Sequence, residues 1–178
     1  FIQEDLNKTY SGIAVKPNVI TNPEGLLIGL TFNGTPATPV NVGTYQAIAT
    51  VKDPNYIGSS TATFNIKAAT AKVTADDKVI NACSSLPPLT ATFSGFVNGE
   101  TQQVVTSLTF NLNPLYAGKA GVYQITPLAS AANYLFTPVQ GTLYVNPFGS
   151  SAKNIKTSLV CVQPITQDPN GYTYIANF

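Results

Sequence analysis

The chain has 178 residues, of which 44% are hydrophobic and only 10% are charged, and its net charge is +1. This apolar content can fill a core, and the near-neutral charge provides no basic surface for a nucleic-acid backbone. The chain has no His and no Arg, which excludes His-dependent nucleophilic catalysis, His metal ligands and Arg phosphate clamps.

The predicted elements are short β-strands, because apolar residues recur with a period of two. Thr, Val, Ile, Tyr and Phe dominate these segments, as expected on a pleated, half-buried surface. Residues 68–72 are too short for a stable helix and are expected to be a linker or a strand edge. In chain order, we expect strands over 25–32, 44–51, 61–66, 121–126, 141–145, 157–165 and 172–178.

An internal repeat organises these strands. Gly43-Thr44-Tyr45 returns 78 positions later as Gly121-Val122-Tyr123, and Asn55-Tyr56 returns at the same spacing as Asn133-Tyr134. We expect the Gly to permit a positive φ or a close approach, and the Tyr to bury its ring with its hydroxyl at the edge. The Asn is expected to cap the backbone of the following turn.

The first half of the chain resembles a known family. Tyr10-Ser11-Gly12 stands where the family has Tyr-Asp-Gly, and Asn22-Pro23-Glu24-Gly25, Gly43-Thr44-Tyr45 and Asp53-Pro54-Asn55-Tyr56 follow in order. This series is similar to the MBG-type repeats of large bacterial surface proteins, which are typically arranged in tandem in adhesin-like chains.

The second half resembles the sister YGX type of the same repeat. It matches at Phe93-Ser94-Gly95-Phe96, Gly121-Val122-Tyr123 and Gly141-Thr142-Leu143-Tyr144-Val145. The Tyr-Gly pair that names this type is missing, and Asn81-Ala82-Cys83-Ser84 occupies its loop. The resemblance implies a secreted or cell-surface location outside the cytoplasm, modular repetition, no enzymatic activity and no cofactor.

The predicted architecture is all-β, with tandem small Ig-like β-sandwich modules and a C-terminal β-hairpin. A β-grasp-like module with one short helix is the alternative, because about 75 residues is small for a seven-stranded sandwich. The expected divisions are module 1 at 1–70, module 2 at 71–147, and a linker with a hairpin at 148–178. That last segment could begin a further module. No run approaches the roughly 20 apolar residues of a membrane helix.

The two cysteines, Cys83 and Cys161, are predicted to form a disulfide, since an even number of Cys in an extracytoplasmic protein favours pairing. The bond would close a loop of about 80 residues and stabilise by roughly 3–5 kcal/mol. Two separate buried thiols are the alternative.

No cluster of acids indicates a catalytic or metal site. Asp76 and Asp77 are adjacent, so on a strand their carboxylates would point to opposite faces. Calcium needs six to eight oxygen ligands, and no Asp-x-Asp-x-Asp series supplies them. We therefore expect no metal site.

Tyr56, Tyr116 and Tyr134 fall in or beside predicted loops and are the candidate ligand-facing aromatics. The single-copy segment 104–119 is a better binding candidate than the repeated Asn-Tyr pairs, because repetition favours a structural role.

Three functions follow from these features. The first is a non-catalytic structural spacer of a bacterial cell-surface or secreted adhesin-like protein, monomeric and contacting neighbouring modules of its own chain. The second is a module that binds a glycan or an extracellular host protein through loops at the ends of the sandwiches. The third is a non-catalytic segment attached to a polysaccharide-degrading enzyme. Neither nucleic acid nor membrane insertion is expected of this segment.

Overall fold

The structure, a computed structural model, describes the backbone of residues 2–147, 161–164 and 174–177 and the side chains of residues 4–147. It confirms the all-β prediction. The described residues contain no α-helix, and their helical segment is the three-residue 3-10 helix η1 (Gln102–Val104). The short helix that the β-grasp alternative requires is therefore not found in the described part of the chain.

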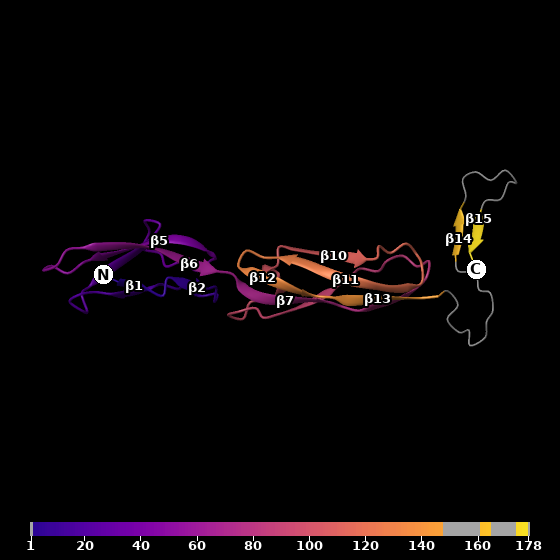
Figure 1. Ribbon diagram of the computed structural model, residues 1–178, viewed down its shortest axis with the longest axis horizontal. Coiled ribbons are helices and arrows are strands. Elements are labelled where there is room, and N and C mark those ends of the chain that lie inside the picture. The colour runs from indigo at the N-terminus through magenta and orange to yellow at the C-terminus, as the bar shows by residue number, and fades with distance from the viewer. Residues whose placement is uncertain (1, 148–160, 165–173, 178) are drawn as a thin grey trace. The chain divides into compact units, whose positions relative to one another are not determined.

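The first repeat pairs its strands into a four-stranded sheet of order β2-β6-β5-β4 and a two-stranded sheet β1-β3. In the larger sheet β2 runs parallel to β6, while β5 is antiparallel to both β6 and β4. The strands, labelled in Figure 1 where there is room, are β1 (Ile2–Glu4), β2 (Asn7–Thr9), β3 (Asn18–Ile20), β4 (Ile28–Phe32), β5 (Gly43–Val51) and β6 (Ser59–Lys67).

The second repeat has a four-stranded sheet β10-β11-β13-β8, in which β8, β13, β11 and β10 correspond to β2, β6, β5 and β4. Its other sheet has three strands in the order β12-β7-β9. Its terminal pair is again parallel, since β8 runs alongside β13 in the same direction. The strands are β7 (Ala69–Ala75), β8 (Lys78–Asn81), β9 (Ala91–Ser94), β10 (Ser107–Asn113), β11 (Gly121–Ser130), β12 (Tyr134–Val139) and β13 (Gly141–Asn146).

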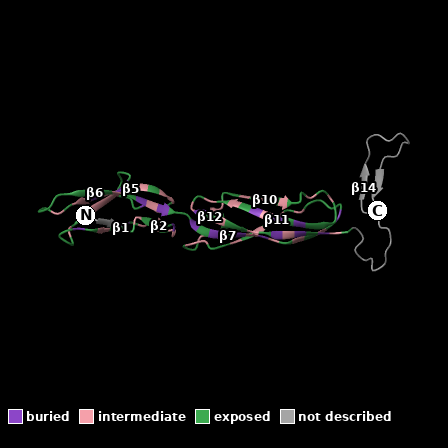
Figure 2. Cartoon of the chain, viewed as in Figure 1, coloured by how far each residue is buried: buried purple, intermediate pink, exposed green. Residues whose placement is uncertain are grey.

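The alternation predicted from the sequence is present in the strands (Figure 2). Ala47 and Ala49 of β5 are fully buried, whereas Thr44 and Gln46 are exposed. The prediction of a linker or strand edge over 68–72 is wrong. That segment begins β7, the middle strand of its sheet, whose residues 69, 71, 73 and 75 all point inward.

Each Gly-x-Tyr motif forms a tyrosine corner at the start of a central strand. The Tyr45 hydroxyl donates to the carbonyl oxygen of Asn41 at 2.8 Å, and the Tyr123 hydroxyl donates to that of Lys119 at 2.8 Å. A Cβ on Gly43 would lie only 3.2 Å from the Tyr45 hydroxyl oxygen, so Gly allows a close approach at this corner. Such a corner is typical of immunoglobulin-like sandwiches.

The described residues pack into two compact units, each with its own core. The first unit comprises the described residues of 1–71 together with 93–107 and 129–137, and the second comprises 72–92, 108–128 and the described residues from 138 onward. The first core is built on Phe32, Phe64, Ile66, Tyr10 and Tyr134, and the second on Tyr123, Ile125, Leu143 and Val145.

The predicted C-terminal hairpin strands are observed as a pair. β14 (Cys161–Pro164) runs antiparallel to β15 (Tyr174–Asn177), with Cys161 opposite Asn177. The turn expected between them lies outside the described residues.

Candidate functional site

The three candidate ligand-facing tyrosines have different surroundings. Tyr56 is 44% exposed in the loop between β5 and β6, as a ligand-facing residue should be. Tyr116 is half-buried, donates from its hydroxyl to the Ser84 carbonyl at 2.7 Å, and packs edge-on against Tyr123. Tyr134 is only 6% exposed and does not face solvent, because its ring lies in the first core.

Tyr134 is instead part of a partly buried polar network in the first unit. The Tyr10 hydroxyl donates to Glu100 Oε1 at 2.6 Å, and the Tyr134 hydroxyl donates to Glu100 Oε2. The backbone N–H of Val97 donates to the Tyr134 hydroxyl oxygen at 3.0 Å. Both carboxylate oxygens are therefore engaged by phenolic donors, a charge-assisted arrangement that is stronger than neutral hydrogen bonds.

Aromatic rings surround this network. Tyr134 meets Tyr10 edge-on, with ring centroids 5.6 Å apart and planes at 80°. Phe96 meets Tyr134 in the same way at 5.1 Å and 89°. Edge-to-face pairs of this kind stabilise by about 0.5–1.5 kcal/mol beyond the area they bury. We call Tyr10, Phe96, Glu100 and Tyr134 the tyrosine–glutamate cluster.

A tight turn presents Glu100 to the two tyrosines. Asn98 and Gly99 both have positive φ, at 52° and 72°, and the Glu100 N–H donates to the Val97 carbonyl at 3.0 Å. Asn-Gly is the sequence most suited to this type I′ geometry. The Asn98 side-chain amide also donates to the Gly12 carbonyl at 3.0 Å.

Asn133 adds a second set of contacts to the first unit. Its side-chain oxygen accepts from the Val42 N–H at 3.0 Å, and its side-chain nitrogen donates to the Asn41 side-chain oxygen at 3.0 Å. The expectation that the repeated Asn caps its own turn is therefore wrong for this copy. In the first repeat the side chain of Asp53 caps the turn, because it accepts a hydrogen bond from the Asn55 N–H at 2.9 Å.

The environment raises the pKa of both clustered tyrosines above the ordinary 10.0. For Tyr10 the hydrogen bond to Glu100 is the main cause and burial the next. For Tyr134 burial comes first, followed by the hydrogen bond to Glu100. Both phenols thus remain protonated donors at neutral pH, which suits holding a carboxylate rather than transferring a proton. Burial, and then Tyr123, also raises the pKa of Tyr116.

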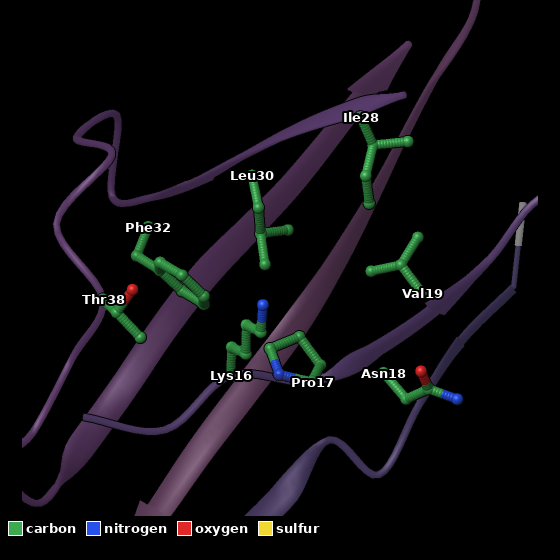
Figure 3. A pocket seen from close by; sticks show the side chains of 8 residues that line it. All are labelled: Lys16, Pro17, Asn18, Val19, Ile28, Leu30, Phe32 and Thr38. Carbon is green, nitrogen blue, oxygen red and sulfur yellow. The ribbon is translucent and has the colours of Figure 1, made fainter. Parts of the chain in front are cut away.

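The first repeat also contains a pocket of about 310 Å³ beside the edge strand β4. Figure 3 shows Ile28, Leu30 and Phe32 of β4 facing Val19 and Pro17 across it. Lys16, Asn18 and Thr38 complete its lining. A second pocket of about 430 Å³ is lined by Phe93, Phe96, Glu100 and residues 101–103. Neither was predicted from the sequence.

The acidic pair is used structurally. Asp76 accepts from the Thr90 hydroxyl at 2.6 Å, and Asp77 accepts from the Thr142 N–H at 2.6 Å. Over the described ranges, no group of three or more His, Cys, Asp or Glu is placed to hold a metal ion. Nor does that part of the chain contain a helix long and apolar enough to pass through a bilayer.

The predicted disulfide falls partly outside the described residues. Cys83 follows β8, and its N–H donates to the Gly118 carbonyl at 2.8 Å. Cys161 begins β14, but its side chain lies outside the described part of the chain. The Cys83–Cys161 pairing therefore stays a prediction.

Half of the binding segment predicted at 104–119 is regular structure. β10 occupies residues 107–113 and forms an edge of the four-stranded sheet. Sequence reasoning missed the tyrosine–glutamate cluster, because Glu100 lies 90 positions from Tyr10 and no local pattern links the two.

Comparison with known proteins agrees with the resemblance described above. A family model described as "MBG domain" matches residues 3–70, and one described as "MBG domain (YGX type)" matches residues 71–144. No curated protein matches the chain.

Proposed function

Because the chain belongs to the MBG domain family, we propose that it is a non-catalytic structural spacer of a bacterial cell-surface or secreted adhesin-like protein. Its partners in this role are the neighbouring modules of the same chain. Its task is to hold a distant binding domain away from the surface that anchors the protein.

The observation that carries this proposal is the tyrosine–glutamate cluster. Tyr10 belongs to the first repeat, and Glu100 and Tyr134 belong to the second, yet all three lie in one compact unit. A flexible linker between modules would leave such groups in water. Burying two phenols on one carboxylate instead favours a border between repeats that resists bending.

The test is the rotational diffusion of the intact chain, measured by NMR relaxation of backbone amides in each repeat. The spacer proposal predicts that residues 4–71 of the first repeat tumble as one body with residues 93–107 and 129–137 of the second repeat in a monomer. Glu100→Ala is the perturbing variant, and Glu24→Ala, which removes an exposed acid, is the control. Independent tumbling of the two repeats in the wild-type chain would overturn the proposal.

A binding module is the second candidate, and the 44% exposure of Tyr56 is the observation that favours it. The discriminating experiment is a screen of the chain against glycans and extracellular-matrix proteins at physiological salt. The spacer proposal predicts no saturable signal. A saturable signal that Tyr56→Ala abolishes, and that the half-buried Tyr116→Phe leaves intact, would make this a recognition module.

We also propose the Cys83–Cys161 disulfide as part of this extracytoplasmic role. Support comes from the even Cys count and from the fixed position of the Cys83 backbone against Gly118. Peptide mapping of chain secreted into an oxidising compartment should give one cross-linked peptide that reductant removes. Alkylation of both cysteines without reductant would contradict the pairing.

A further inference from the structure

The first and last strands of the first repeat's main sheet are parallel neighbours. The register places Asn7, Lys8 and Thr9 of β2 opposite Asn65, Ile66 and Lys67 of β6. The ladder extends beyond the strand ends, because the Asn65 N–H donates to the Leu6 carbonyl at 2.8 Å and the Tyr10 N–H donates to the Lys67 carbonyl at 2.8 Å.

The second repeat has the same arrangement in its own unit. Residues 78–81 of β8 lie opposite residues 143–146 of β13 in parallel register. The Ala82 N–H donates to the Asn146 carbonyl at 2.8 Å, and Asp77 accepts from the Thr142 N–H at 2.6 Å. Side-chain and backbone hydrogen bonds therefore extend the ladder at both ends.

This pairing decides how tension along the chain acts on each repeat. In the first repeat the chain passes through β2 early and leaves through β6, so opposite pulls on its ends slide these two strands past each other. The hydrogen bonds of the ladder run across the strands and therefore across the direction of pull. They share the load and must break together, whereas strands pulled apart from one end break their bonds one at a time.

From this geometry we propose that each repeat is a force-bearing element in which the parallel pairs β2–β6 and β8–β13 act as shear clamps. The inference deepens the proposed spacer function and rests on it, because only a chain held at both ends experiences tension. β1 and β7 precede the clamps and pair in the other sheets, so tension must separate them before β2 and β8 are loaded. Resistance to forced unfolding depends on the unfolding rate rather than on equilibrium stability.

The experiment pulls single molecules of the full chain by ligation tags at its two ends. A reducing buffer keeps both repeats in the load path whatever the state of Cys83 and Cys161. We expect two separate high-force unfolding events, one for each repeat. A single low-force event, or gradual extension without peaks, would overturn the clamp.

A matched pair of variants tests the clamp in the first repeat. Lys8→Pro removes a backbone donor from the edge strand β2, and Thr31→Pro removes one from the opposite edge strand, β4. Both should lower the equilibrium stability measured in urea, but only Lys8→Pro should reduce the unfolding force of the first repeat severalfold. An equal loss of force in Thr31→Pro would overturn the proposal.

A milder pair covers the case in which a proline variant does not fold. Asn7→Ala removes the acceptor of the Asn65 side-chain amide at 3.3 Å, a contact between the clamped strands, while Asn55→Ala changes an exposed loop. Asn7→Ala should shift the force distribution downward and Asn55→Ala should not. If neither variant shifts the force distribution and the wild-type unfolding forces are low, the clamp proposal is wrong. The spacer proposal would still be decided by its own tumbling and binding measurements.

Discussion

Replacing Tyr134 by Phe removes one oxygen from the tyrosine–glutamate cluster and leaves the ring packing in place. The lost hydroxyl donates to Glu100 and accepts from the Val97 N–H at 3.0 Å. The ring can keep its edge-on contacts with Tyr10 and Phe96. The variant therefore isolates the polar part of the cluster.

The magnitude follows from the two lost partners. A hydrogen bond to a charged group contributes about 1.5–3 kcal/mol, and a buried donor left without an acceptor costs about 1–3 kcal/mol. Val97 is only partly buried, so its term falls at the low end. We expect Tyr134→Phe to lower the free energy of unfolding of the first unit by about 2–4 kcal/mol.

Urea denaturation followed by circular dichroism measures this change, with the transition of the first unit fitted separately. Tyr45→Phe is the control in the same unit, since it loses a single neutral hydrogen bond to the Asn41 carbonyl. Its expected cost is about 0.5–1.5 kcal/mol. Both variants should keep the wild-type denaturant dependence, because neither changes the surface that unfolding exposes.

The result that refutes this reasoning is a Tyr134→Phe variant no less stable than Tyr45→Phe. The hydrogen bond from Tyr134 to Glu100 would then stabilise the unit no more than the neutral hydrogen bond from Tyr45 to a peptide carbonyl does. The rigidity argument behind the spacer proposal would lose its main support.

Three further predictions concern the same unit. Since the pKa values of Tyr10 and Tyr134 are raised in the folded state, the unfolded chain loses these protons first, and the unfolding free energy should fall as pH rises above about 10. Urea midpoints against pH should show this fall, and the double variant Tyr10→Phe/Tyr134→Phe should flatten it; an unchanged slope would contradict the assignment. Gly12→Ala should cost about 1–3 kcal/mol by thermal denaturation, because its φ is +75° and the new Cβ would lie 2.5 Å from the Cβ of Asn98. Asn98→Asp loses a donated hydrogen bond and should cost about 1 kcal/mol in urea, whereas Asn33→Asp keeps the acceptor that binds the Gln46 N–H and should be nearly neutral; the reverse order would be a failure.

Local sequence patterns predicted the central strands β5, β6, β11 and β13, whereas β7, β10 and β12 were not predicted. In β5 the alternation of small apolar and polar residues assigns each side chain to a face, and Ala47 and Ala49 are buried as expected. Each corner is also local, because Tyr45 reaches back four residues to Asn41. Such features need no knowledge of distant parts of the chain.

The tyrosine–glutamate cluster depends on distant partners and could not be predicted in this way. Asn55-Tyr56 and Asn133-Tyr134 are the same dipeptide, yet Tyr56 is 44% exposed and Tyr134 only 6%. The difference arises because Tyr10 and Phe96 pack around the second copy. A repeated motif therefore conserves the strand geometry but not the environment of its side chains.

The single residue between β6 and β7 has a consequence for dissecting the chain with proteases. Proteolytic nicking concentrates in exposed loop tips that can unfold locally. Ala68 is exposed, but Lys67 before it accepts a hydrogen bond from Tyr10 and Ala69 after it donates one to Asn133. Limited digestion should therefore cut within the loops of a repeat before it cuts between the two repeats. The ends of the resulting fragments would then not mark the border between the repeats.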